Sequence, residues 1–104
     1  MNLLIKNLNP EKLKQNIINL IEQGALKTWT TFPDNEELYI QHTGQLGQKG
    51  VVKLTPYVNN KFLKVQIFEL KTNKEDIKSF EGYYLGRFCE IIFVNFPKES
   101  FTLG

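Results

Sequence analysis

The side chains best suited to chemistry gather near the C-terminal end of the chain, in residues 74–96 (KEDIKSFEGYYLGRFCEIIFVNF). Arg87 and Glu90 stand three residues apart in a run that is otherwise apolar and aromatic, a spacing that lets them meet on a helix surface. Buried charge is costly unless it is paired, so charges in such a run have a structural or a functional reason. A guanidinium can hold an anionic group and a carboxylate can transfer protons. The pair could therefore form the polar floor of a shallow site.

Other polar and aromatic residues could complete this site. Tyr83 and Tyr84 lie one helical turn before Arg87, while Gly82 and Gly86 remove side-chain bulk from the same region. The binding residues that we predict are Trp29, His42, Gln45, Tyr83, Tyr84, Arg87 and Glu90. The structural alternative is that backbone segments cross closely at the glycines and that Arg87 only pairs with a neighbour inside the fold.

Catalysis and metal binding find little support in the residue counts. The chain has one histidine, His42, and one cysteine, Cys89. Cys89 stands in an apolar run, which is expected to raise the pKa of its thiol and leave it inert. A lone histidine cannot anchor a multi-histidine metal site, and the carboxylates of residues 34–37 lack the alternating order of a calcium loop. We predict no catalytic residue, no metal and no cofactor.

The glycine-punctuated segment 44–50, GQLGQKG, resembles two phosphate- or nucleic-acid-binding patterns but matches neither. Its glycine and lysine order is not that of a Walker loop. It contains GxxG, but the GxxG loop of a KH domain joins two helices, whereas this segment is expected to join two strands. We interpret it as a mobile hairpin loop whose glycines could let a ligand or partner approach closely.

Charge and composition argue against an extended nucleic-acid surface. The chain has 104 residues and a formal net charge of +2, from 13 basic and 11 acidic residues. Lys53, Lys61 and Lys64 alternate with Tyr57 and Phe62, but the pattern is loose. We therefore rank nucleic-acid binding below the other functions. The N-terminal residues lack the pattern of a signal peptide, and no apolar run could span a membrane, so a cytoplasmic location is expected.

Two helices can be placed from caps and periodicity. Asn9 can cap the first helix at Pro10, with Leu8 and Leu13 as a hydrophobic staple, and Gly24 ends it. Its apolar stripe consists of Leu13, Ile17, Leu20 and Ile21. The second helix begins at a capping box in residues 72–75, continues through the two glycines to about Asn95, and is stopped by Pro97. Residues 88–96 could also form a strand, because periodicity does not separate the two structures there.

Four strands are predicted between the helices, at residues 26–32, 38–43, 51–57 and 62–70. Their short connections favour antiparallel pairing. Residues 1–104 thus form a single α+β domain in the order α-β-β-β-β-α, with two helices packed on a four-stranded antiparallel sheet. Residues 101–103 could add a short last strand.

The chain resembles a family of small bacterial proteins that have no established function. The matching residues are Thr28-Trp29, then Thr43 with Gln45, the run YYLGRFCE at 83–90, and Asn95-Phe96. Leu85 stands where this family tends to have histidine, and Leu46 where it tends to have tryptophan. A role in binding survives these two changes more easily than catalysis does.

Our leading hypothesis is therefore a cytoplasmic protein-binding module, monomeric or homodimeric. An immunity protein that neutralises a bacterial toxin by covering its active site is the most concrete version, with Trp29, Tyr83, Tyr84 and Arg87 as anchors. The alternative is a small-ligand-binding protein or enzyme with a polar pocket around Arg87 and Glu90. Both hypotheses need the guanidinium and carboxylate to be accessible to another molecule.

Overall fold

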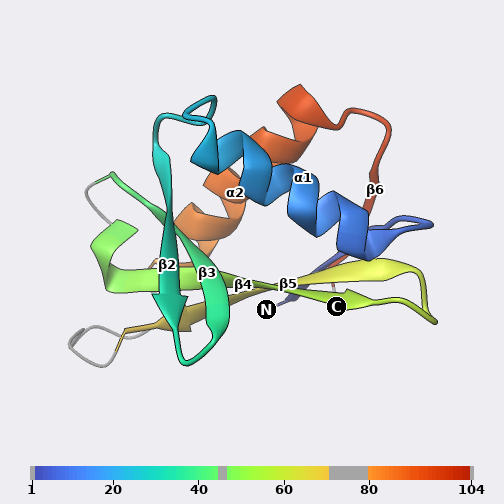
Figure 1. Cartoon of the computed structure of the whole chain (residues 1–104), viewed down its shortest axis with the longest axis horizontal. Helices are drawn as coiled ribbons and strands as arrows, with labels where there is room; N and C mark the ends of the chain where they lie inside the picture. The colour runs from blue at the N-terminus through green and yellow to red at the C-terminus, as the bar shows by residue number, and fades with distance from the viewer. Residues whose placement is uncertain (1, 45–46, 71–79, 104) are drawn as a thin grey trace.

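The fold combines two helices with one antiparallel sheet (Figure 1). A computed structural model describes residues 2–44, 47–70 and 80–103. In chain order the elements are β1 (Asn2–Lys6), α1 (Pro10–Glu22), β2 (Trp29–Asp34), β3 (Glu37–His42), the 3-10 helix η1 (Gly47–Lys49), β4 (Gly50–Tyr57), β5 (Phe62–Glu69), α2 (Glu81–Asn95) and β6 (Ser100–Leu103). No helix among the described residues is long and apolar enough to cross a membrane.

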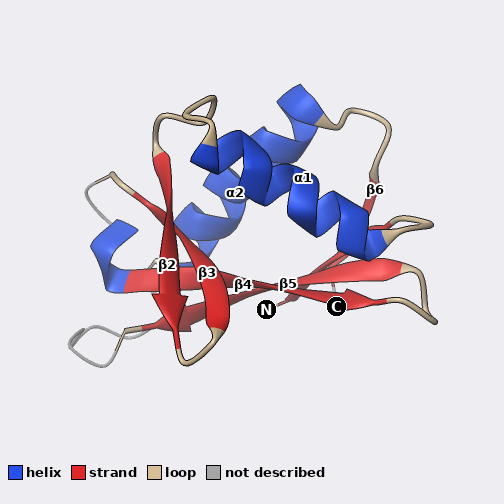
Figure 2. Ribbon diagram, viewed as in Figure 1, coloured by secondary structure: helices blue, strands red, loops and turns tan. Residues whose placement is uncertain are grey.

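The strands lie in the order β2-β3-β4-β5-β1-β6, and every neighbouring pair is antiparallel (Figure 2). The α+β class, the antiparallel pairing and the four predicted strands are confirmed, and the optional last strand is present as β6. The predicted strand count is nevertheless too low, because β1 was missed. Leu3 and Ile5 alternate with half-buried or exposed residues over only five positions, and the partner strand β5 is about 60 residues away in the sequence. So short a run becomes a strand through this distant pairing.

Local signals place α1 correctly at both ends. The side chain of Asn9 accepts a hydrogen bond from the backbone N–H of Lys12 at 3.2 Å, and Gly24 after the helix has a φ of +77°. The left-handed conformation at that position is the usual reason for glycine after a helix. The predicted hydrophobic staple is wrong, because Leu8 is 83% exposed. The buried residues of the helix are Pro10, Leu13, Ile17, Ile18 and Ile21.

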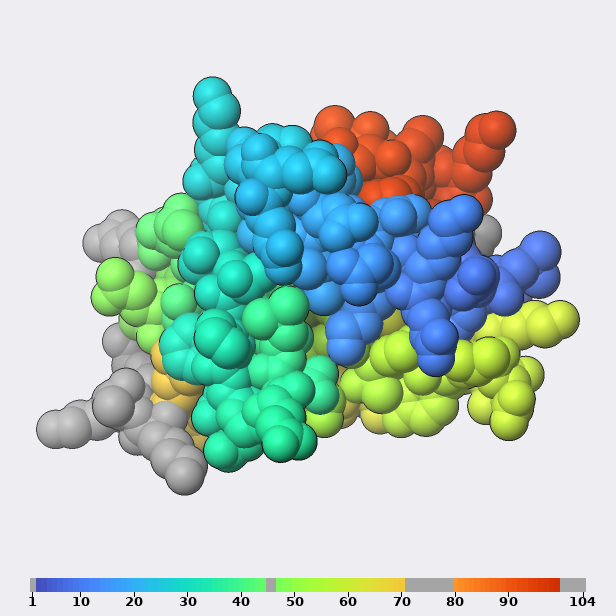
Figure 3. Space-filling view, in the orientation of Figure 1, coloured from blue at the N-terminus to red at the C-terminus, as the bar shows by residue number. Residues whose placement is uncertain are grey.

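Both helices cover the same face of the sheet. In the space-filling view, α1 lies against the β2–β3 hairpin on one side and the β4–β5 hairpin on the other (Figure 3). The core lies between the helices and the sheet, where alternate residues of β4 and β5 such as Leu54 and Val65 are buried. The intervening residues of these strands point to the opposite face, because side chains alternate along a strand.

The sheet opens between β3 and β4. Only Ile40 and Val52 are paired there, whereas β4 and β5 are paired over their full length. The β2–β3 hairpin therefore turns away from the direction of β4 and β5, as Figure 1 shows. Backbone groups next to this opening need partners other than the usual strand ladder, because an unpaired buried amide or carbonyl costs free energy.

The second helix is shorter than predicted. It begins at Glu81, with Phe80 as a non-helical N-cap residue at φ −133°, and it ends at Asn95 before Pro97 as expected. A continuous helix from residue 72 is therefore wrong at Phe80, while the predicted capping box at 72–75 lies outside the described residues. The helical assignment of residues 88–95 is confirmed over the strand alternative.

Gly86 of α2 gives a direct test of whether its missing side chain supports the fold. A methyl group added there would meet nothing within 4 Å, so Gly86→Ala should raise the free energy of unfolding by about 1 kcal/mol through helix propensity. Gly50→Ala is the matched control, because its Cβ would lie 2.7 Å from the Phe68 carbonyl oxygen and should destabilise the protein. Urea unfolding of the two variants measures both effects. Destabilisation by Gly86→Ala would contradict this account.

Candidate functional site

The hydroxyl group of Tyr84 joins the two sides of the sheet opening. Tyr84 projects inward from the first turns of α2 and is fully buried. Its Oη accepts a hydrogen bond from the backbone N–H of His42 in β3 at 3.3 Å and donates to the carbonyl of Gly50 in β4 at 2.7 Å. The carbonyl of Gly47 is also a partner of this hydroxyl. The side-chain amide of Gln41 in β3 also donates to the Gly50 carbonyl, at 3.3 Å, so these two side chains replace part of the strand ladder that β3 and β4 lack.

Burial raises the pKa of Tyr84 to about 12, so the phenol stays protonated and can donate at neutral pH. The residue predicted to contact a partner is therefore an internal support. Trp29 was also predicted to contact a partner, but it is buried at the start of β2. Its ring packs edge-on against the rings of His42 and Tyr84, with centroid distances of 5.0 and 6.1 Å.

His42 forms a second link between the sheet and α2. Its Nδ1 accepts a hydrogen bond from the backbone N–H of Gly44 at 3.0 Å and lies 3.1 Å from the Tyr83 hydroxyl oxygen. A ring nitrogen that accepts from both donors carries no proton, so the neutral ring holds its proton on Nε2. Burial lowers the pKa of His42, the positive charge of Arg87 lowers it further, and Glu90 opposes these effects.

The glycines of residues 44–50 serve this internal cluster. A Cβ at Gly44 would lie 2.6 Å from the Tyr83 hydroxyl, and one at Gly47 would collide with the carbonyl of His42. The close approach that the sequence suggested is therefore made by the protein's own His42 and Tyr83. Residues 47–49 form the 3-10 helix η1, so this part of the predicted mobile loop is ordered structure.

Arg87 and Glu90 lie on the outer surface of α2. Arg87 Nη1 is 2.9 Å from Glu90 Oε1, and the two side chains are 47% and 62% exposed. The guanidinium also lies over the ring of Tyr83, 5.4 Å from its centroid. An exposed ion pair of this kind contributes at most about 1 kcal/mol, so either group can leave it for another molecule at small cost. The predicted buried charge is in fact a surface pair.

A small hollow lies beside this pair, between α2 and the segment that enters β2. Its volume is about 160 Å³, and it is lined by Leu26, Thr28, Trp29, Arg87, Glu90, Ile91, Val94 and Asn95. The buried Trp29 and Ile91 form its base. Val94 lines it and is 76% exposed, and the adjacent Phe93 of the same helix is 62% exposed, so two large apolar side chains are exposed together near the end of α2.

Four residues of α2 form one continuous surface stripe, which we call the α2 stripe: Tyr83, Arg87, Glu90 and Val94. Their spacing of four, three and four residues places them on one side of the helix. The neighbouring series Tyr84, Phe88 and Ile91 is buried, so the stripe runs along the border between the core and the surface. Sequence reasoning missed Val94, although its spacing from Arg87 and Glu90 was the signal that could have found it.

The structure separates the seven predicted binding residues into two groups. Tyr83, Arg87 and Glu90 are at the surface, while Trp29, His42 and Tyr84 are buried behind them. Gln45 lies outside the described residues. Only Trp29, Arg87 and Glu90 line the hollow, because His42 and Tyr84 are turned toward the sheet opening.

Two kinds of reactive group remain to be described: the thiol of Cys89 and the side chains that could bind a metal ion. Cys89 is half-buried, and burial raises the pKa of its thiol as the sequence suggested. No group of three or more possible metal ligands occurs among the residues that the structure describes.

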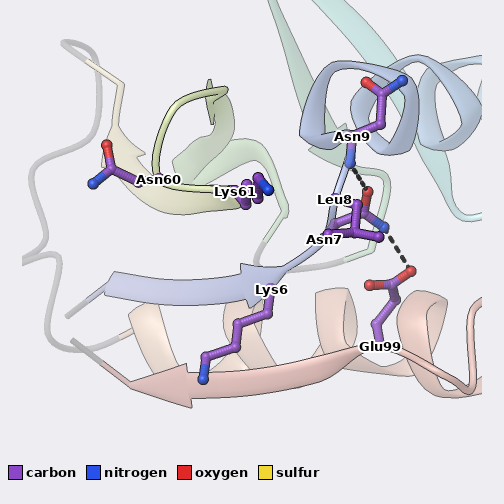
Figure 4. A pocket seen from close by; sticks show the side chains of 7 residues that line it. All are labelled: Lys6, Asn7, Leu8, Asn9, Asn60, Lys61 and Glu99. Atoms are coloured by element: carbon purple, nitrogen blue, oxygen red, sulfur yellow. Dashed lines mark hydrogen bonds between the residues drawn. The ribbon is translucent and has the colours of Figure 1, made fainter.

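A larger hollow of about 590 Å³ lies at the other end of the molecule, where β1 leads into α1 (Figure 4). Asn7 donates a hydrogen bond to Glu99 at 2.8 Å there, and its own side-chain oxygen accepts from the N–H of Asn9 at 2.7 Å. The ends of Lys6 and Asn60 point away from this contact in Figure 4. These polar groups tie the loop before α1 to the loop before β6 and do not converge on one point.

The Tyr84 hydroxyl can be tested by removing one atom. Tyr84→Phe leaves the buried His42 amide and the Gly50 carbonyl without this partner, so the free energy of unfolding should fall by about 1–3 kcal/mol. Tyr83→Phe is the matched control and should cost less than about 1 kcal/mol, because Tyr83 is only half-buried. Chemical denaturation measures both. If the two variants lost equal amounts of unfolding free energy, the bridge between the strands would not contribute more than the hydroxyl of Tyr83.

The lowered pKa of His42 predicts loss of stability in mild acid. The unfolded chain has the ordinary histidine pKa of 6.5, so below this pH it binds a proton that the folded protein still excludes. The stability contributed by neutral His42 is present above about pH 6.5 and is lost as the pH falls toward the lowered value. Unfolding should be measured at about pH 7.5 and pH 5.5 for the wild type and for His42→Gln. The wild type should lose more stability than the variant, and parallel losses would refute the assignment.

Comparison of the chain with models of protein families, with curated proteins and with solved structures gave no match.

Proposed function

We propose that this protein is a protein-binding module and that the α2 stripe is its contact surface. The observation that carries the proposal is the exposure of Val94 and Arg87 at the rim of an apolar hollow. Tyrosine and arginine are enriched among interface residues that contribute most binding energy, and an apolar side chain beside them adds buried area on association. The exposed ion pair adds a charged group of each sign that a partner can complement.

The internal cluster supports this proposal by fixing the stripe. Tyr84 and His42 hold the first half of α2 to the sheet through hydrogen bonds on the buried side. The stripe is therefore presented without a large loss of conformational freedom on binding, which favours affinity. Trp29 and Tyr84 contribute here as supports, so we reduce the expected anchors to Tyr83, Arg87 and Val94.

The most specific form of the proposal is a bacterial immunity protein, located in the cytoplasm, that covers the active site of a toxin. A compact chain with a rigid surface of mixed charge and apolar character suits such a role. Its partner would approach the α2 stripe, and the hollow would receive one side chain of that partner.

The alternative of an enzyme or small-ligand site has weaker support. Pockets for small ligands are usually about 300–1,000 Å³, larger than the hollow beside Arg87. That hollow also lacks His42 and Tyr84, so the acid, base and anion-binding groups that the alternative needs do not face one cavity.

Alanine substitutions test the stripe. We expect Arg87→Ala or Val94→Ala to weaken binding of the captured partner by more than about 2 kcal/mol, or roughly 30-fold. The matched controls are Lys12→Ala and Leu8→Ala, which remove an exposed charge and an exposed apolar side chain elsewhere on the molecule. Tagged protein should be used to capture its partner from bacterial cells that carry the gene, and calorimetric titration should follow with each variant.

The four proteins should unfold at similar temperatures, since all four changes are at exposed positions. A partner that binds all four variants as tightly as the wild type would show that the contact surface lies elsewhere. Toxin activity that the wild type does not inhibit would reject the immunity form alone.

A further inference from the structure

The face of the sheet that points away from both helices carries a regular arrangement of lysines, which adds Lys6 of β1 to the Lys53 and Lys64 that the sequence pattern contained. Figure 2 shows α1 and α2 on one side of β4 and β5. On the other side, register brings residues of β4, β5 and β1 into three rows: Lys53–Gln66–Asn2, Thr55–Lys64–Leu4 and Tyr57–Phe62–Lys6. We call these nine residues the open-face grid.

The three lysines of the grid form a diagonal. Each row is displaced by two residues along the strands, and each step from Lys53 to Lys64 to Lys6 moves to the next strand. With ordinary strand spacing and rise, the Cα atoms of successive lysines are about 8 Å apart. Lys6 is exposed, while Lys53 and Lys64 are half-buried, as expected when the aliphatic stem lies on the sheet and the ammonium reaches water.

The grid has positive charge without compensating acid. None of the acidic residues in the part of the chain that the structure describes occupies any of its nine positions. Its potential is therefore positive although the net charge of the whole chain is only +2.

Aromatic rings border one end of this diagonal. Tyr57 and Phe62 are stacked with their centroids 4.8 Å apart, and Phe62 is paired directly with Lys6. Tyr57 is 39% exposed, so its ring can be covered by a further flat group. The remaining positions offer the hydroxyl of Thr55 and the amides of Gln66 and Asn2 as hydrogen-bonding groups.

We propose that the open-face grid binds single-stranded nucleic acid. A line of cations that follows a phosphate backbone, beside aromatic rings on which bases stack, is the combination that sequence-tolerant single-strand binding uses. The diagonal course of the lysines across three strands suits a flexible strand better than a rigid duplex. This site lies on the opposite side of the sheet from the α2 stripe, so it is independent of the proposed protein-binding function.

The proposed site does not extend to the end of this face that lies next to the β2–β3 hairpin. There a hollow of about 750 Å³ is lined by apolar residues that include Phe32, Tyr39 and Phe68, but also by Asp34 and Glu69. These carboxylates would repel phosphates, so we do not extend the nucleic-acid path into it. A short site with three phosphate contacts results.

Fluorescence anisotropy with labelled oligothymidine and oligouridine tests this proposal. Three phosphate contacts on a single strand predict that affinity falls by about 20-fold between 50 and 200 mM salt. The triple variant Lys6→Glu/Lys53→Glu/Lys64→Glu should reduce binding by more than tenfold at low salt. The triple control Lys12→Glu/Lys27→Glu/Lys98→Glu makes the same change in net charge at exposed positions outside the grid and should bind far more tightly than the grid variant.

The aromatic contribution needs its own pair of variants. Tyr57→Ala should weaken binding by about tenfold, because a stacking surface is lost. Tyr57→Phe keeps the ring and should bind like the wild type. Melting curves should be measured to check that each variant is folded. If the triple glutamate variant unfolds, the triple variant Lys6→Gln/Lys53→Gln/Lys64→Gln should be used in its place.

Several outcomes would overturn the proposal. One is no binding to either oligonucleotide at low salt, and another is equal binding by the grid variant and the charge-matched control. Binding to anionic phospholipid vesicles or to an acidic peptide, but not to the oligonucleotides, would also reject it and would assign the lysines to a different ligand. Loss of binding in Arg87→Ala would place the contact on the α2 stripe instead.

Discussion

The buried hydroxyl of Tyr84 is the interaction on which the rest of the structure depends. The sheet opens between β3 and β4, and this group meets the amide of His42 on one side and the carbonyl of Gly50 on the other. The phenol, with the side-chain amide of Gln41 on the same Gly50 carbonyl, therefore satisfies backbone groups that a continuous strand ladder would normally pair. The same contact fixes the rotation of α2 about its axis, because Tyr84 can reach the opening from only one side of the helix.

The outer surface follows from that inner contact. Once Tyr84, Phe88 and Ile91 are buried, the residues one position before or after them on the helix surface must form the border of the core. Tyr83 then meets His42, and Arg87 lies over the ring of Tyr83. The binding stripe and the internal cluster are thus two sides of one helix segment. The glycines near His42 belong to the same arrangement, because side chains at Gly44 and Gly47 would occupy the space of its neighbours.

Local sequence signals predicted much of the secondary structure but only part of the site. Asn9, Pro10 and Gly24 identify the first helix because capping and glycine conformation act within a few residues. The strand β1 was not predicted, because its stability comes from pairing with β5 and β6, which are distant in the sequence. For the site, residue type singled out Tyr83, Arg87 and Glu90 as candidates, but it placed the two charges in the interior, whereas the structure places them at the surface. It could not separate them from Trp29 and Tyr84, because aromatic residues serve cores and interfaces equally well.

By itself, the sequence determined the α+β class, the antiparallel pairing of the hairpins, and the raised pKa of a lone cysteine thiol in an apolar run. These properties depend on neighbours in the chain and on the count of each residue type. Tertiary structure alone decided that Arg87 and Glu90 are exposed, that Tyr84 bridges two strands, and that three lysines from β4, β5 and β1 lie on one diagonal. Each of these facts depends on the register between segments distant in sequence, which long-range packing selects and local propensity does not encode.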